Sequence, residues 1–142
     1  MKKRIDIILL ILWMILIFIM SSFDAVESGN QSGSIVTFIG NILNISDVSL
    51  LSLIIRKLAH FTKYFVLGVL TINVFKDYKV DNVFIYSLLF CVFYACTDEI
   101  HQLFVPGRSG NIMDVLIDSF GSLIGCTSYF LLLKKMKKII KR

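Results

Sequence analysis

The sequence predicts an all-α, polytopic membrane protein with four transmembrane helices and a short amphipathic helix between the first two. Three observations predict this fold: 56% of the 142 residues are hydrophobic, only 18% are charged, and the charges gather between four long apolar runs. A soluble domain has roughly 45–50% apolar and about 25% charged residues. Lipid is therefore the expected solvent. No repeat or Pro/Gly-rich linker divides the chain, so we expect residues 1–142 to form a single domain.

The first span is expected at about residues 7–23, "IILLILWMILIFIMSSF". Its length lies at the short end of the range of about 17–25 residues that cross a bilayer. A cleavable signal peptide is the alternative. The apolar run is long for such a peptide and lacks a convincing small-x-small cleavage motif, so we favour a retained anchor.

The more polar stretch that follows, residues 24–47, contains the expected amphipathic helix. Its apolar residues recur at helical spacing, opposite Thr37 and two asparagines. This pattern suits a helix lying in the membrane interface, and a helix packed within the loop is equally compatible. The apolar residues are Ile35, Phe38, Ile39, Ile42 and Ile45.

The other three spans are expected at about residues 48–75, 83–103 and 112–133. Asp47 or Ser46 is suited to cap the second span. That span would be roughly 42 Å long against a hydrocarbon core of ~30 Å, so its first turns should reach the interface. Pro106-Gly107 predicts a turn before the last span.

The distribution of basic residues predicts the orientation. With a cytoplasmic N-terminus, 11 of the 15 lysines and arginines lie inside the cell, as the positive-inside rule requires. The tail "KKMKKIIKR" is explained by topology and an anionic inner leaflet. We therefore expect both termini to be cytoplasmic, and we expect no nucleic-acid partner.

This topology places the unusual polar residues at one depth, on the outer side. Because a helix turns by 100° per residue, each of the last three spans presents a polar stripe. We expect these stripes to form a polar pocket open to the outer surface. The expected pocket residues are Lys57, His60, Tyr64, Asp98, Glu99, Gln102, Arg108, Asp114 and Asp118; Gly68 and Thr71, and Gly121, Gly125 and Ser128, continue two of the stripes, and His101 lies at the rim.

Several of these residues also have structural interpretations. Arg108 could extend to the lipid headgroups or pair with an acid of the pocket. Asp114 falls at the third position of a helix capped by Asn111, and Tyr64 suits an interface aromatic or a hydrogen-bonding anchor. His60 could be a structural histidine or an acid–base group.

The charge of the pocket narrows its chemistry. Four acids (Asp98, Glu99, Asp114 and Asp118) face two cations, Lys57 and Arg108. Such a site must hold a proton, a cation or a ligand to be stable. The histidines and acids lack metal-ligand spacing and come from three spans, so the sequence assigns no metal and no cofactor. Cys91, Cys96 and Cys126 lie in apolar runs and are expected to be small buried hydrophobes.

The motifs "RKLAHFTKYFVLG" and "DEIHQLFVPGRSGNIMDVLIDSFGSLIG" together resemble the VanZ-like family of small bacterial membrane proteins. The chain departs from the family pattern at Lys63, where many members have Glu. The founding member is associated with teicoplanin resistance, so the resemblance implies a bacterial plasma-membrane protein that contributes to glycopeptide resistance. It also implies a lipid headgroup, a cell-wall precursor or a lipoglycopeptide as a possible partner besides the bilayer.

Two functions are consistent with these residues. In the first, the pocket binds an envelope component or the drug without catalysis. In the second, the protein is a hydrolase or transferase that acts on an outer-leaflet lipid or lipid-linked precursor. The catalytic candidates are then Glu99, His60 and Asp98, with Arg108 and Lys57 holding the headgroup.

Overall fold

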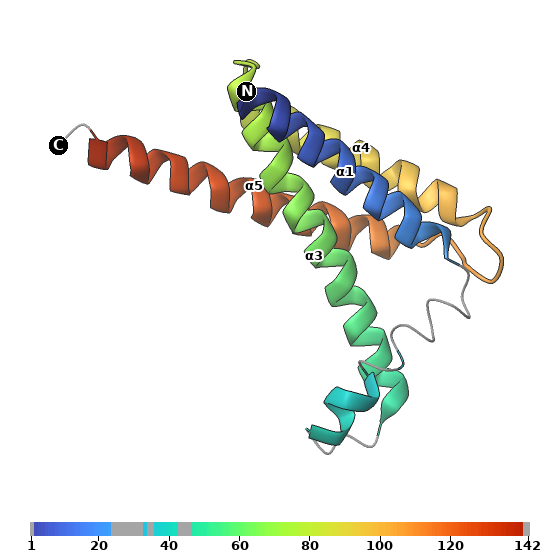
Figure 1. The fold of residues 1–142 in the computed structure, drawn as a ribbon. Coiled ribbons are helices and arrows are strands. Elements are labelled where there is room, and N and C mark those ends of the chain that lie inside the picture. Colours follow the sequence, from blue (N-terminus) through green and yellow to red (C-terminus); the bar gives the residue numbers. More distant parts are fainter. Residues whose placement is uncertain (1, 24–32, 34–35, 43–46, 141–142) are drawn as a thin grey trace.

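Four long helices make up the computed structural model, which describes residues 2–23, 33, 36–42 and 47–140 (Figure 1). They are α1 (Lys2–Ser22), α3 (Val48–Asp77), α4 (Val83–Gln102) and α5 (Ile112–Ile140). No strand occurs among the described residues. Each helix has a segment long and apolar enough to cross a membrane: Lys3–Ser22, Val48–Asp77, Val83–Gln102 and Ile112–Lys135. The predicted all-α fold with four transmembrane helices is confirmed.

The helix ends follow the expected signals. Asp47 caps α3 by accepting a hydrogen bond from the Leu50 backbone N–H at 3.0 Å, and this bond lowers the pKa of Asp47. Gly107 has a φ of 72° in the turn after α4, a conformation that glycine adopts without strain. The candidate span in α5 ends at Lys135, close to the predicted end near residue 133, and the helix itself continues to Ile140 through Lys, Met and Ile residues.

A short helical segment, residues 36–42, lies in the connection between α1 and α3. Phe38 and Ile42 are exposed, at 67% and 63%, whereas Val36 is buried. The predicted amphipathic helix is therefore present over these residues, while Ile35 and Ile45 lie outside the described part of the chain. Its position in the membrane interface stays a prediction.

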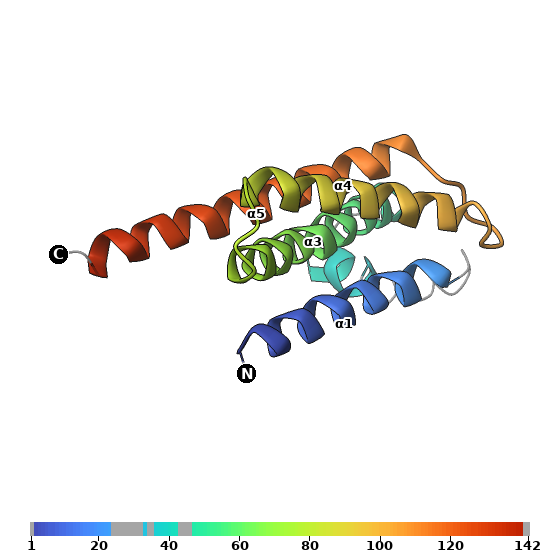
Figure 2. The same ribbon diagram turned by 90° about the horizontal axis from the view of Figure 1, so that it is seen from above.

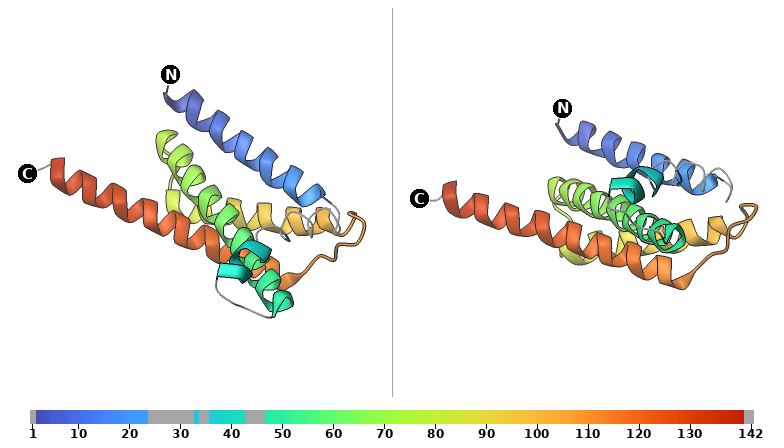
Figure 3. Two further views of the ribbon diagram at one scale, coloured as in Figure 1. Left: turned by 60° about the horizontal axis from the view of Figure 1, so that its bottom comes forward. Right: turned by 90° about the horizontal axis from the view of Figure 1, so that it is seen from below.

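The helix α3 occupies the centre of the bundle. It contacts α1, α4 and α5, whereas α1 and α5 do not contact each other in the described part of the chain. Figures 2 and 3 show α1 and α5 on opposite sides of α3. The outward face of α1 is lined by exposed apolar side chains, as expected for a surface in contact with lipid.

The closest packing is the crossing of α3 and α5, where glycines remove the side chains that would separate the backbones. A Cβ atom at Gly68 would lie 2.6 Å from the carbonyl oxygen of Ser122, and one at Gly121 or Gly125 would collide with a backbone carbonyl of α3. Small residues allow such contacts in membrane helices. Gly121 and Gly125, which continue the predicted stripe of the last span, therefore form this helix contact. Ser128, which we had placed on the same stripe, is exposed, because it lies past the crossing.

The helix α1 is attached to the bundle by side-chain hydrogen bonds to backbone carbonyls. Trp13 Nε1 donates to the carbonyl oxygen of Lys63 at 2.9 Å, and the Tyr94 hydroxyl donates to that of Met14 at 2.7 Å. Leu10 and Ile17 are buried on the inward face of α1. These contacts fix the depth of α1 relative to α3 and α4.

The glycine crossing leads to a prediction about stability. Gly125→Ala should lower the stability of the purified protein by about 1–3 kcal/mol, because the added methyl group meets the Phe65 carbonyl. Alanine favours a helix more than glycine does. A loss of stability in Gly125→Ala would therefore come from the clash with the α3 backbone and not from helix propensity. Thermal unfolding in detergent measures the effect, and Ser128→Leu, at an exposed position of α5, is the control. Equal melting temperatures for wild type and Gly125→Ala would contradict the close crossing.

The predicted orientation can be tested by labelling with a membrane-impermeant thiol reagent in intact cells. Ser109→Cys, in the turn between α4 and α5, should react from outside, whereas Asp81→Cys, in the turn between α3 and α4, should react only after permeabilisation; both positions are exposed. Cys96 is changed to alanine in both variants, while Cys91 and Cys126 are buried. The reverse labelling pattern would invert the topology.

Candidate functional site

Polar side chains from all four helices converge in one buried cluster. Figure 1 shows that the ends of α1 and α4 lie near the start of α5, the region that supplies most of these residues. The site is built mainly from residues that the sequence had placed on polar stripes, and it lies beside the glycine crossing. Each residue is at most 6% exposed, so the cluster is closed in this structure, and its opening to the outer surface stays a prediction. The buried residues are Ser21, His60, Asp98, Glu99, Gln102, Asp114 and Asp118.

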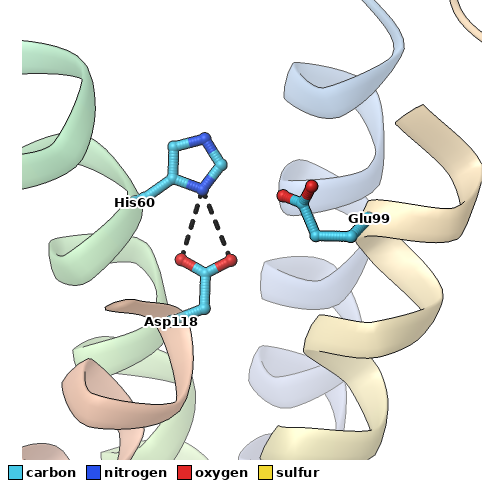
Figure 4. Close-up of side chains that lie close together, drawn as sticks. All are labelled: His60, Glu99 and Asp118. Atoms are coloured by element: carbon cyan, nitrogen blue, oxygen red, sulfur yellow. Dashed lines mark hydrogen bonds and ion pairs between the residues drawn. The ribbon is translucent and has the colours of Figure 1, made fainter. Parts of the chain in front are cut away.

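The centre of the site is formed by one residue from each of three helices: His60 of α3, Asp118 of α5 and Glu99 of α4. His60 Nδ1 lies 3.2 and 3.3 Å from the two carboxylate oxygens of Asp118. Figure 4 shows the Glu99 carboxylate pointing toward this pair from α4. One nitrogen or oxygen atom from each residue lies within 4.8 Å of the others. We call these three residues the His60 centre.

Asp98 is held by neutral donors from α1 and α4. Its Oδ2 accepts a hydrogen bond from the Ser21 hydroxyl at 2.9 Å and one from Gln102 Nε2 at 3.4 Å. Its Oδ1 is buried and has no hydrogen-bond partner among the described residues. Ser21 was not among the predicted site residues. The signal available in the sequence was the pair of serines that ends the first apolar run.

Glu99 is held by the turn that leads into α5. Its Oε2 accepts a hydrogen bond from the Asn111 backbone N–H at 2.9 Å, and its Oε1 accepts one from Gln102 Nε2 at 3.3 Å. An acid near the C-terminus of a helix opposes the helix dipole and needs such donors. The backbone donor could not be found from residue types, because it depends on how the turn folds back over α4.

Arg108 extends from the turn over this network. Its Nη1 donates to Gln102 Oε1 at 3.1 Å, so Gln102 joins Arg108 to both acids of α4. Burial lowers the pKa of the guanidinium, Arg56 acts in the same direction, and Asp98 and Glu99 oppose them. Arg108 therefore contributes positive charge to an otherwise acidic site.

Lys57 and Asp114 form an ion pair between α3 and α5 at the edge of the site. The side chains are 23% and 9% exposed. As predicted, Asn111 caps α5: its Oδ1 accepts a hydrogen bond from the Met113 N–H at 3.0 Å. Asp114 does not complete a capping box, because its carboxylate points to Lys57.

Other polar residues lie around the centre. Tyr64 is fully buried rather than at the interface, and its hydroxyl has no hydrogen-bond partner in the described part of the chain. His101 lies at the rim, as expected: its ring stacks on Phe18 with a centroid distance of 4.4 Å. Arg56 is exposed and Lys63 is half-buried.

Two apolar cavities border the site. One, of about 500 Å³, lies between the first halves of α3 and α5, and Lys57 is its only charged lining residue. The other, of about 260 Å³, lies between α4 and α5 and is bordered by Glu99 and Asn111. The polar cluster therefore has apolar cavities next to it on both the α3 side and the α4 side of α5.

Comparison with known proteins places this arrangement in a family. A family model described as VanZ/LLP1 matches residues 7–133, which include α3, α4, most of α1 and α5, and every residue of the site. No curated protein and no solved structure matches the chain.

The ion pair between Lys57 and Asp114 leads to a prediction. Lys57→Met should lower stability because it leaves a largely buried carboxylate without its partner. The double variant Lys57→Met/Asp114→Asn should recover part of the loss, with a coupling of about 0.5–3 kcal/mol. Thermal unfolding of wild type, Lys57→Met, Asp114→Asn and the double variant measures this coupling. Arg56→Met, at the exposed neighbouring position, is the control and should change stability little. Additive single effects would show that the pair contributes no coupling.

Proposed function

This chain belongs to the VanZ/LLP1 family, and from that premise we propose that it is an envelope enzyme. The proposed reaction is hydrolysis or transfer at the polar headgroup of an outer-leaflet lipid or lipid-linked cell-wall precursor. The observation that supports it best is the His60 centre, where one imidazole and two carboxylates are buried together. Burying an ionised group costs free energy. A site that served only to hold the helices together would therefore contain fewer charged side chains.

The proposed division of roles follows the geometry. His60, Glu99 and Asp118 activate the attacking water or hydroxyl, because their polar atoms face one another across a short gap (Figure 4). Arg108 and Lys57, at the edges of the cluster, hold an anionic headgroup. Asp98, which the sequence analysis named as a catalytic candidate with Glu99 and His60, is joined to Glu99 through Gln102.

The apolar cavity of about 500 Å³ between α3 and α5, a groove open to the surface, supports a lipid substrate. Apart from Lys57, its lining consists of aliphatic and aromatic side chains. An acyl chain in the groove would bring a headgroup to Lys57, which pairs with Asp114 of the site. A lipid could therefore approach the polar cluster from within the bilayer.

The proposed link to glycopeptide resistance is indirect. The residues of the His60 centre are at most 5% exposed, which leaves no space for a large lipoglycopeptide between them. We therefore propose that the protein alters an envelope component on which the drug depends. Binding of the drug or a precursor without chemistry is the alternative that the following experiment separates.

Conservative variants test the proposal. His60→Gln and Glu99→Gln should lower the conversion of the envelope lipid by about 10²-fold or more. They should also abolish any gain in teicoplanin resistance when expressed at wild-type membrane levels. Lipid mass spectrometry and susceptibility tests provide the readouts. His101→Gln and Asp81→Asn, one at the rim and one in the turn between α3 and α4, are the matched controls.

The outcome also distinguishes catalysis from binding. If both variants protect fully and the envelope lipids match those of wild type, the enzymatic proposal is wrong. If resistance follows binding of a precursor while no lipid is converted by the wild type, the non-catalytic function takes its place.

A further inference from the structure

We propose that His60, Glu99 and Asp118 form a binding site for a divalent transition-metal ion, with Zn²⁺ as the defining probe. This inference deepens the proposed function by naming a cofactor for the same centre. The geometry is the first argument: three helices each supply one ligand atom, and these atoms lie within 4.8 Å of one another. A small inward movement would bring them to the metal–ligand distances of about 2.0–2.2 Å that Zn²⁺ forms with imidazole and carboxylate.

The chemistry of the donors selects the class of ion. One imidazole nitrogen and two carboxylates suit Zn²⁺ or Mn²⁺, whereas Ca²⁺ prefers oxygen ligands alone and softer ions prefer sulfur. Three protein ligands leave coordination positions open, as in catalytic zinc sites, which keep a position for water or substrate. Cys96, which borders the neighbouring cavity, is not part of the three-residue group.

The charge of the buried site is the second argument. Asp98, Glu99 and Asp118 are buried, and Lys63 and Arg108 act on them electrostatically. With neutral His60, three negative and two positive charges leave a net charge of −1. A divalent ion changes this to +1, which a phosphate ester headgroup or a hydroxide would neutralise. The ion thus explains how an acidic site could receive an anionic headgroup.

Two buried polar atoms provide an independent third argument. The Tyr64 hydroxyl and Asp98 Oδ1 have no hydrogen-bond partner in the described part of the chain, and the residues are 0% and 4% exposed. Tyr64 lies one turn after His60 on α3 and interacts electrostatically with Asp98 and Asp118. An unsatisfied buried polar atom costs about 1–3 kcal/mol. Hydrogen-bonding capacity therefore remains unused among the residues that surround the His60 centre, as expected where a ligand binds.

The surrounding hydrogen bonds suit metal ligands. The Asn111 N–H and Gln102 fix the Glu99 carboxylate, and Gln102 is in turn held by Arg108. Ligands of metal sites are commonly oriented by such outer contacts. The sequence had given no metal site, because ligands on three separate helices have no characteristic spacing.

The test uses the full chain, purified in detergent without a histidine tag, stripped with a chelator and titrated with Zn²⁺. Wild type should bind about one Zn²⁺ per chain and gain thermal stability, since an ion that binds the folded state stabilises it. Mg²⁺ at the same concentration should have a smaller effect. Bound metal is measured by mass spectrometry after gel filtration.

Variants assign the site. Glu99→Gln, Asp118→Asn and His60→Gln should each weaken Zn²⁺ binding by at least about tenfold to a hundredfold, the range seen even for outer-shell changes. His101→Gln should bind as wild type does, because that histidine lies at the rim. A Glu99→Gln variant that does not give a monodisperse peak in gel filtration is replaced by Glu99→Asp. This variant keeps a carboxylate on a side chain shorter by one methylene, and it should also weaken Zn²⁺ binding.

Two results would overturn the proposal: a wild-type protein whose melting temperature and metal content do not change with Zn²⁺, or binding that survives in Glu99→Gln and is lost in His101→Gln. The outcome is separate from that of the proposed enzyme. If Zn²⁺ binds but no lipid is converted, the metal site is supported and the enzymatic proposal is wrong. If the metal-free protein converts lipid, the enzymatic proposal is supported and the metal is not its cofactor.

Discussion

The close crossing of α3 and α5 is the constraint on which the rest of the structure depends. Gly121 and Gly125 allow α5 to touch the α3 backbone at Phe61 and Phe65. His60 immediately precedes Phe61, and Asp118 lies one turn before Gly121. The same contact that packs the helices therefore brings the His60 and Asp118 side chains within hydrogen-bonding distance. A larger residue at the crossing would separate both the backbones and this pair.

The second constraint is electrostatic. Acids at the end of α4 oppose the helix dipole, and their burial removes the solvation that would stabilise them. The turn after α4 compensates by providing the Asn111 N–H, and α1 contributes the Ser21 hydroxyl. Four helices and a turn are thus arranged around a few ionisable groups, which is more than packing alone requires. This concentration of polar contacts is why we treat the site as functional.

Much of this arrangement could be predicted from the sequence because hydropathy and helical phase determine which residues face inward. They gave the four spans, the α3 stripe of His60 and Tyr64, and the acids on α4 and α5. They could not give the pairing of Lys57 with Asp114 or of His60 with Asp118, because the relative heights of helices depend on the crossing. Ser21 was missed because the pair of serines that ends the first apolar run does not by itself show which hydroxyl faces the acids of α4. Ser128 was misplaced because helical phase alone does not show where a contact ends.

The proposed function follows from what such a centre can bind and activate. Apolar cavities next to a buried, acidic, histidine-containing cluster suit the proposed substrate, a molecule with both a chain and a charged headgroup. Family membership and four candidate spans make the chain a multi-pass membrane protein. The central claim is that His60, Glu99 and Asp118 meet in one reactive centre. The most direct measurement is a crystal structure in a lipid phase with Zn²⁺ and anomalous data collected at the zinc edge. The account predicts a single strong peak bonded to all three side chains. Side chains directed into lipid, or far apart with no peak between them, would contradict it.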